Sequence, residues 1–551
     1  MLRLKMDGRL TDHELLERKR FEAERLVKAF VWKSGLGADF PPIICLVGGT
    51  GTGKSTLFNS LAGRKVSEVG ARRPYTLKAV ILVHEAWVEQ LMSCPFLIEN
   101  GSDTTLITHS DLRNHSAILV DTPDFDSVQV SNRVIAENFF IICDVMLFVT
   151  SQEKYADLAG RKITETASAW KKDTVFVMNK VFSRGAYDDF VRSIGSHGLE
   201  TRPLLVERLE SSPDLIAGLN ERPGFADLLN PESVAGRAHI RPQELSRLRS
   251  RAASSLEDLE SALRVQLERV ESANSRIRAI LTDVADDMDR QLDALVTDDV
   301  EGQIRDRLQN LLRKYDILFV PRMLVRRAVR EIFGTIADLF GESRHQSALS
   351  ERDIRSEDLE QTRSAVRLKP LESAVAALNL RVAEFLASDQ SLEDLRRVAR
   401  DTVPRLGADE IRSRYEETFP GIEHLLEMEF TRFKDGLSSK DELKLYGSYT
   451  LWALFIITAE VVMGGGFTLL DALLNTVIMP FIPKWLLNLK VLDVLREIGE
   501  RVDKKNREAL EQILTHQAQL YISGFSGLLP SPEAMKHISD LRSGLSNYVP
   551  R

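Results

Sequence analysis

The stretch GGTGTGKS, residues 48–55, fits the pattern G-x-x-x-x-G-K-[ST] and decides how the first part of the chain folds. It follows the apolar run IICLV, residues 43–47, which has the length of a buried strand, and the residues after it, TLFNSLAG, predict a helix. Glycines let backbone N–H groups curl around an anion, and a helix N-terminus adds a favourable partial charge. The sequence therefore predicts a phosphate-binding loop. Its nucleotide-binding residues are Gly48, Gly51, Gly53, Lys54, Ser55 and Thr56.

Two further motifs support a nucleotide site. The run AILVDTP, residues 117–123, predicts a strand that ends in Asp121, the acid expected to hold Mg²⁺. The run VFVMNK, residues 175–180, predicts a strand that ends in Asn179 and Lys180. Between the phosphate-binding loop and Asp121 lies RPYT, whose Thr76 is placed where a switch loop adds a hydroxyl to the metal. We therefore expect Ser55, Thr76 and Asp121 to bind Mg²⁺, and Lys54, Thr76 and Asp121 to act in catalysis.

In this order, GTGTGKSTLFNSLAG, RPYT, DTP and NK resemble the first four motifs of the translation-factor-related P-loop GTPases, over roughly residues 41–235. The resemblance implies an α/β domain with a mostly parallel sheet and helices on both faces. It also implies an enzyme that binds GTP and GDP and hydrolyses GTP with Mg²⁺. Asn179 and Lys180 would then pack around the base.

The chain departs from this family in two motifs. Phe182 stands at the position of the Asp that binds the guanine base in the family, which makes the selectivity for guanine less secure. GTP is still the expected nucleotide, and the alternative is ATP or the use of both nucleotides. Asp124 stands where the family has Gly, and its charge would oppose a phosphate unless the side chain points away. Phe125 follows where many relatives carry a water-positioning Gln, so slow intrinsic hydrolysis is expected. Arg72 and Arg73 are either an arginine finger or a solvated basic pair.

Outside the motifs, hydrophobic periodicity divides the chain. Apolar runs recur at 79–83, 145–149 and 204–206 with helical segments between several of them, which indicates βαβ units. From residue 245, apolar residues recur every three or four positions for about fifty residues, which predicts a helix of roughly 75 Å. The expected parts are an N-terminal amphipathic helix packing on the helical body (1–40), the GTPase domain (41–235), an all-α stalk (240–444), an apolar hairpin (445–486) and C-terminal helices returning to the stalk (487–551).

Residues 445–483 form the apolar segment, which holds only two charged side chains, Glu460 and Asp471. Its longest uncharged run is shorter than the roughly 20 residues of a spanning helix, so a single transmembrane helix is not expected. Gly464 to Gly466 would allow a turn near its middle, which brings both acids close to the tip. Lysines flank both legs at the other end. The segment is either a membrane-associated paddle or a helical pair buried in the core of the bundle.

Composition excludes several classes of protein. The 551 residues carry 73 Lys+Arg and 81 Asp+Glu, a net charge of -8, which does not favour a nucleic-acid partner. Three cysteines cannot form a disulfide framework, which favours a reducing compartment. The charged N-terminal residues lack the apolar region of a signal peptide. We therefore expect a cytoplasmic protein, held at the inner face of a membrane by residues 445–486.

A GTPase head, a long helical body and an apolar hairpin together resemble bacterial dynamin-like proteins in architecture. The resemblance implies membrane remodelling or tethering, contact with membrane lipid, and a homodimer or higher oligomer formed through the heads. The alternative is a soluble regulatory GTPase that acts as a switch on a protein or ribosomal partner. A third reading, a structural protein with a degenerate site, conflicts with the intact Gly53, Lys54, Ser55, Thr76 and Asp121.

Overall fold

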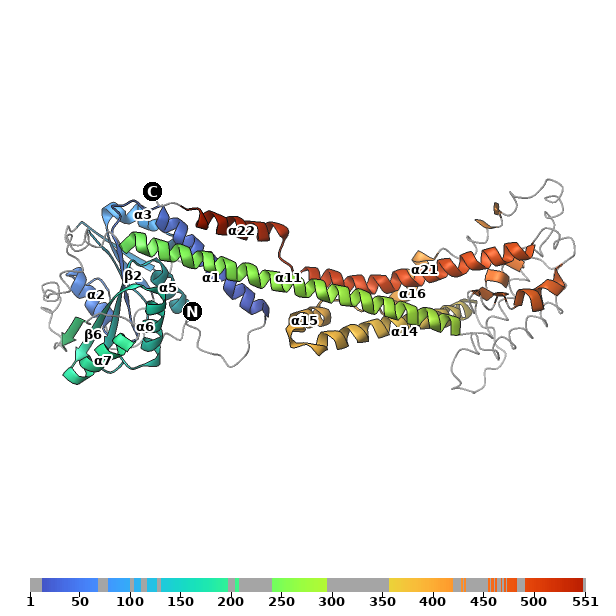
Figure 1. The fold of residues 1–551 in the computed structure, drawn as a ribbon, viewed down its shortest axis with the longest axis horizontal. Helices are drawn as coiled ribbons and strands as arrows, with labels where there is room; N and C mark the ends of the chain where they lie inside the picture. Colours follow the sequence, from blue (N-terminus) through green and yellow to red (C-terminus); the bar gives the residue numbers. More distant parts are fainter. Residues whose placement is uncertain are drawn as a thin grey trace. The chain divides into compact units, whose positions relative to one another are not determined.

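The computed structural model describes residues 12–67, 78–99, 104–110, 116–125, 130–196, 204–207, 240–294, 356–419 and 491–548, with shorter stretches between 428 and 482. The chain divides into two compact units. The first contains residues 1–265 and 530–551, and the second contains residues 266–529. Figure 1 shows the elements of both units in chain order by colour.

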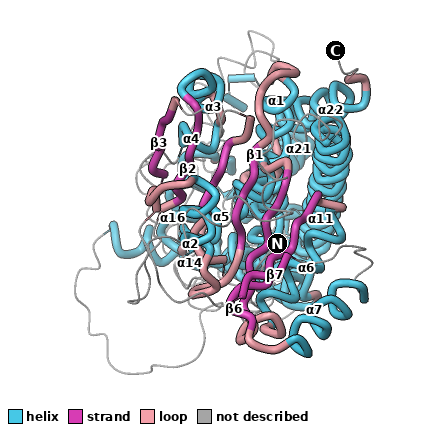
Figure 2. Tube along the Cα trace, turned by 90° about the vertical axis from the view of Figure 1, so that its left-hand side faces the viewer, coloured by secondary structure: helices cyan, strands magenta, loops and turns pink. Residues whose placement is uncertain are grey.

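A seven-stranded sheet lies at the centre of the first unit, in the order β3-β2-β4-β1-β5-β6-β7 (Figure 2). The strands are β1 (Ile43–Val47), β2 (Ala79–His84), β3 (Thr104–His109), β4 (Ile118–Asp121), β5 (Val145–Ser151), β6 (Asp173–Val181) and β7 (Leu204–Glu207). The five strands from β4 to β7 in this order are parallel, and β2 pairs antiparallel with β4. The expected mostly parallel sheet is confirmed. The edge strand β3, which pairs with β2, was not predicted.

Helices cover both faces of this sheet because its central strands are apolar on both sides. All five residues of β1 are buried, and alternate residues enter different cores. Ile44 and Leu46 pack with α2 (Lys54–Ala62), whereas Ile43 and Cys45 share a core with residues of the helices on the opposite face. Those helices are α1 (Asp12–Ser34), α3 (Val88–Met92), α4 (Pro95–Glu99), α5 (Val130–Ile142), α6 (Leu158–Trp170), α7 (Arg184–Ser196) and the first half of α11 (Ile240–Ala294).

The N-terminal helix α1, which the sequence predicts to pack on the helical body, belongs to the first unit. Its Arg25 forms an ion pair with Glu137 of α5, at 2.9 Å. It also reaches the first half of α11, where the Lys19 ammonium donates to the Asp258 carbonyl. The C-terminal helix α22 (Pro532–Ser546) joins the same core through Leu545, and its Arg542 pairs with Glu260 of α11.

Within its described residues, the regular secondary structure of the second unit is helical. It contains the second half of α11, α14 (Ser356–Ser388), α15 (Glu393–Asp401), α16 (Ala408–Thr418) and α21 (Val491–Ser526), which share one apolar core. The single long helix expected from residue 245 is confirmed as α11. Arg507 of α21 forms ion pairs with Asp289 and Asp293 of α11, at 3.0 and 2.6 Å.

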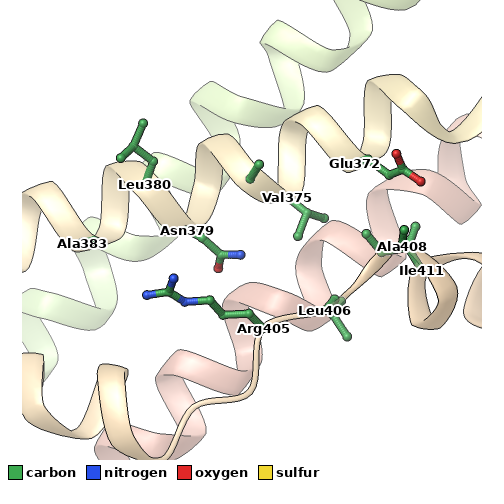
Figure 3. A pocket seen from close by; sticks show the side chains of 10 residues that line it. Glu372, Val375, Asn379, Leu380, Ala383, Arg405, Leu406, Ala408 and Ile411 are labelled. Atoms are coloured by element: carbon green, nitrogen blue, oxygen red, sulfur yellow. The ribbon is translucent and has the colours of Figure 1, made fainter.

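A hollow of about 460 Å³ opens on this unit between α14 and the segment that leads into α16 (Figure 3). Its apolar lining includes Val375, Leu406 and Ile411, and Figure 3 shows Asn379 and Arg405 beside it. The amide oxygen of Asn379 accepts a hydrogen bond from the Tyr521 hydroxyl at 2.9 Å.

The described part of the apolar segment is packed inside the second unit. Most of its large apolar side chains are buried, including Phe455 at 0% and Leu470 at 0% exposure, whereas Met479 is 42% exposed. A side chain at Gly499 of α21 would collide with Leu470, so the two pack in direct contact. Asp471 forms an ion pair with Arg496 of α21, at 2.8 Å. Within the described residues, none of the helices combines the length and the hydropathy that a membrane span requires. The turn expected at residues 464–466 lies outside the described residues.

Candidate nucleotide site

Three parallel strands bring the predicted motifs to one edge of the sheet. β1 ends just before Gly48, β4 ends at Asp121, and β6 carries Asn179 and Lys180 at its end. In the paired register Leu46 faces Asp121 and Ser151 faces Asn179. Because the carboxyl ends of parallel strands meet at the same edge, residues far apart in sequence form one site.

The loop from residue 48 to 53 takes a conformation that its glycines allow. Gly53 has φ of 93° and precedes the first residue of α2, Lys54. This left-handed backbone strains residues that carry a Cβ atom. A Cβ atom at Gly48 would collide with the Val149 carbonyl of the neighbouring strand. The loop therefore has the tight turn and helix N-terminus that an anion requires. Ser55 and the exposed Thr56 lie in the first turn of this helix.

The Lys54 side chain is buried in this loop, with 4% of its surface exposed. Its ammonium donates to the carbonyls of Gly48 and Gly49, at 2.8 and 3.3 Å. It also forms an ion pair with the carboxylate of Asp124. Asp124 thus points toward the phosphate-binding lysine, which is the orientation that we expected to oppose phosphate.

Asp121 is fully buried and accepts hydrogen bonds on one carboxylate oxygen only. The hydroxyls of Ser55 and Ser67 donate to Oδ2, at 2.7 and 2.9 Å, whereas Oδ1 is buried with no hydrogen-bond partner. Burial raises the pKa of Asp121, and Lys54 opposes this by favouring the charged form.

These oxygen donors fit a magnesium ion. A buried carboxylate oxygen without a partner next to a serine hydroxyl is a site that a hard divalent cation satisfies. Ser55 and Asp121 would hold the ion, which neutralises phosphate charge when bound. Within the described residues, no group of three or more His, Cys, Asp or Glu side chains could hold a metal by itself, so the phosphates and Ser55 would complete the set.

Asn179 and Lys180 reach across to the phosphate-binding loop. The Asn179 amide donates to the Thr52 carbonyl at 2.9 Å, and the Lys180 ammonium donates to the Gly51 carbonyl at 2.7 Å. Lys180 has φ of 56°, a left-handed backbone, and its N–H donates to the Asn179 side chain. The two side chains therefore join the end of β6 to the loop, a contact that the sequence did not predict.

Phe182 is 58% exposed and brings no carboxylate to this edge. Its backbone N–H, and that of Ser183, donate to the side-chain oxygen of Gln152, at 2.6 and 3.0 Å. Gln152 therefore fixes the loop that follows Asn179 and Lys180. Gln152 was not predicted as a site residue, because a single glutamine after a strand belongs to no motif.

Sequence reasoning also missed Asn59 and Ser67. The Asn59 side chain accepts from the N–H groups of Val66 and Ser67 and donates to the Ser67 carbonyl. This holds Ser67 against Asp121, directly before residues 68–77. Thr76, Arg72 and Arg73 lie outside the described residues.

Comparison with known proteins supports a GTPase domain. Residues 43–180 match the model of the family described as 50S ribosome-binding GTPase. No curated protein matches the chain in sequence. Two solved structures of an oligomerised bacterial dynamin pair, described as a mechanism for long-range sensing and tethering of membranes, are similar to this chain. Their TM-scores are 0.41 and 0.40 at 12% identity, covering 99% of this chain and 96% of each matched chain.

The likeness to these two structures is too distant to assign a function. The family match covers the strands and loops that build the site, from β1 to Lys180. Residues 43–180 are therefore a P-loop GTPase domain of the translation-factor-related class, which binds and hydrolyses GTP.

Proposed function

We propose that this protein is a GTP-driven switch in which the nucleotide state of the sheet changes the conformation of the helical region. Mg²⁺ held by Ser55, Thr76 and Asp121 would accompany the nucleotide, and Lys54 would bind its β- and γ-phosphates. The observation that carries the proposal is a pair of buried ion pairs. They lie at the amino ends of the parallel strands, opposite the phosphate-binding loop, and they join α1 and α11 to the sheet.

The first pair joins α1 to the start of β5. Lys33 and Asp144 are 2.8 Å apart, and their side chains are 1% and 2% exposed. Burial alone would raise the pKa of Asp144, but Lys33 stabilises the carboxylate and the net pKa is lowered. Lys33 also donates to the Ile142 carbonyl, and Asp144 accepts from the Ile43 N–H. One buried pair therefore fixes α1, the end of α5 and the start of β1.

The second pair joins α11 to the residue before β6. Lys172 and Glu244 are 3.0 Å apart, and their side chains are 1% and 5% exposed. The pKa of Lys172 is raised although burial opposes this, because Cys143 and Glu244 favour the ammonium form. The Arg251 guanidinium lies over the Trp170 ring at 4.3 Å and holds the next turns of α11 to α6.

The helix α5 lies between the nucleotide site and these pairs in the sequence. It follows Asp121 and Asp124 along the chain, and it ends at Ile142, two residues before Asp144. α11 begins four residues before Glu244 and continues for 55 residues to Ala294, which belongs to the second unit. A shift of the Asp121 loop would therefore act on α5, on the buried pairs and on α11.

Hydrogen–deuterium exchange tests the switch. With a non-hydrolysable GTP analogue in place of GDP, we expect altered exchange in α5 and in residues 266–294 of α11. The same comparison in a Lys54→Ala variant should show no difference. Exchange that changes only around the phosphate-binding loop would contradict the proposal.

We further propose that the protein is cytoplasmic, forms a homodimer or higher oligomer through its GTPase heads, and associates with the inner face of a membrane through residues 445–486. The composition of the apolar segment supports this. Because Phe455 and Leu470 are buried against other side chains, the segment would have to open before its apolar residues could reach lipid. Hydrolysis-driven movement of the helical region would supply that opening, consistent with a role in membrane remodelling or tethering.

The same burial favours the second candidate function, a soluble GTPase switch whose apolar segment stays in the core. Co-sedimentation with vesicles of anionic phospholipid separates the two. Membrane association predicts that the protein pellets with vesicles in one nucleotide state, and that deletion of residues 445–485 abolishes this while GTP binding remains. A protein that stays in the supernatant in every nucleotide state would support the soluble switch.

A further inference from the structure

We propose that the Asp124 carboxylate is an internal competitor of the γ-phosphate, so that a triphosphate must displace it from Lys54 and a diphosphate need not. The proposal concerns a residue that departs from its family, in the sequence DTPD at 121–124. It makes Asp124 a positioning residue that sets the preference of the site between GTP and GDP.

The contact that carries the proposal is the ion pair between Lys54 and Asp124. The lysine side chain is 4% exposed and the aspartate side chain is 17% exposed, so water screens the pair only weakly. Two carbonyls of the loop, Gly48 and Gly49, accept the other hydrogen bonds from the ammonium. An ammonium has three donors, and the contacts of Lys54 use all of them.

A phosphate and a carboxylate are the same kind of partner for a lysine, because both are anions that accept charge-assisted hydrogen bonds. The lysine of such a loop reaches the β- and γ-phosphates. A terminal phosphate that takes the place of the carboxylate must either push it away or share the site with it. Two negative charges within a few ångströms in a buried site repel strongly, so the carboxylate must leave.

The departure of Asp124 would move a neighbour that belongs to the core. Phe125 follows directly, is 6% exposed and packs in the apolar core that also contains residues of α1, α5 and α11. Thr122, two residues before Asp124, is fixed by a hydrogen bond from its hydroxyl to the Leu46 carbonyl at 2.7 Å. The chain between Thr122 and Phe125 would therefore bend when Asp124 is displaced.

A matched pair of substitutions tests the proposal. Asp124→Asn keeps the shape of the side chain and removes its charge. Asp189→Asn removes one acid from the same unit at an exposed ion pair with Arg192, away from the loop. For each variant, fluorescence titration measures the affinity for the β,γ-imido analogue of GTP and for GDP, and a circular-dichroism melt shows that it is folded.

We expect Asp124→Asn to bind the triphosphate analogue at least tenfold more tightly than the wild type, while its affinity for GDP changes less than threefold. Asp189→Asn should match the wild type for both nucleotides. An equal gain for both nucleotides would overturn the proposal, since it would show that Asp124 only lowers the general attraction of the site for anions. Weaker triphosphate binding by Asp124→Asn would also overturn it, because Asp124 would then assist the nucleotide.

Discussion

Lys54 is the residue on which nucleotide binding depends most directly. Its ammonium is held at the turn of the loop and is paired with a carboxylate rather than with solvent. We predict that Lys54→Ala lowers the affinity for a labelled GTP analogue by at least a hundredfold, because a buried charge-assisted contact is lost. Arg192→Ala, on the exposed surface of α7, should leave the affinity unchanged. Unchanged binding by Lys54→Ala would mean that the nucleotide binds elsewhere.

The raised pKa of Asp121 predicts that the stability of the nucleotide-free protein depends on pH. Its folded pKa lies above the unfolded value, so the folded state binds the proton more tightly. The stabilisation from the protonated form is complete below the unfolded pKa, near 4, and is lost as pH rises through the folded pKa.

It follows that Asp121→Asn should raise the melting temperature of the metal-free protein at pH 7. Thermal melts at pH 4 and pH 7 measure it, and the gain should be smaller at pH 4. The same variant should lose the extra stabilisation that GTP with Mg²⁺ gives the wild type. A lower melting temperature at pH 7 would contradict the account.

At this scale the sequence predicted the motif residues but not their contacts. The pattern G-x-x-x-x-G-K-[ST] fixes Lys54 and Ser55 at a helix N-terminus, because that chemistry needs those residues in that order. The contacts of Ser67 and Gln152, and the direction of Asp124, depend on side chains from loops far apart in the chain. Neither periodicity nor spacing records such contacts.

At the scale of elements, the buried pair of Lys172 and Glu244 predicts strong energetic coupling between the sheet and α11. Glu244→Leu alone should destabilise the first unit by about 3–5 kcal/mol, because it leaves a buried ammonium without its partner. Adding Lys172→Met to Glu244→Leu should restore most of this loss, because an apolar pair of similar volume avoids the desolvation of two charges.

Urea denaturation of the wild type, both single variants and the double variant measures the coupling. Additive effects of the two substitutions would show that the pair does not join the elements. The exposed pair of Arg192 and Asp189, treated in the same way, should give a coupling below about 1 kcal/mol.

Substitution of Gly499 tests whether the apolar segment packs in direct contact with α21. A glycine inside a helix normally costs about 1 kcal/mol relative to alanine, so Gly→Ala is stabilising where space allows. At Gly499 a Cβ atom would collide with Leu470, and Gly499→Ala should destabilise the second unit by about 1–3 kcal/mol. Gly544→Ala in α22, where a Cβ atom meets open space, should stabilise the protein instead. Chemical unfolding of both variants checks this, and stabilisation by Gly499→Ala would show that the segment does not pack there.

Elements were predicted where the hydrophobic pattern is strong. The continuous apolar runs of β1 and β5, and the stripe of α11, are typical of buried strands and of a long amphipathic helix. β3, with sequence TTLITH, escaped prediction because it is half polar and at the edge of the sheet, where only one neighbour pairs with it. The apolar segment has the composition of either a membrane or a core helix, so composition alone leaves both readings open.

At the scale of the whole molecule, we propose that the nucleotide site and the helical region are parts of one switch. The most direct test is a distance measurement between spin labels at Arg192 of α7 and Arg396 of α15, one in each unit. The native cysteines are buried at 0% exposure, so introduced surface cysteines react selectively. We predict that the distance distribution differs between GDP and a non-hydrolysable GTP analogue, and that Lys54→Ala removes the difference. Identical distributions in both nucleotide states, in a protein shown to bind both, would contradict it.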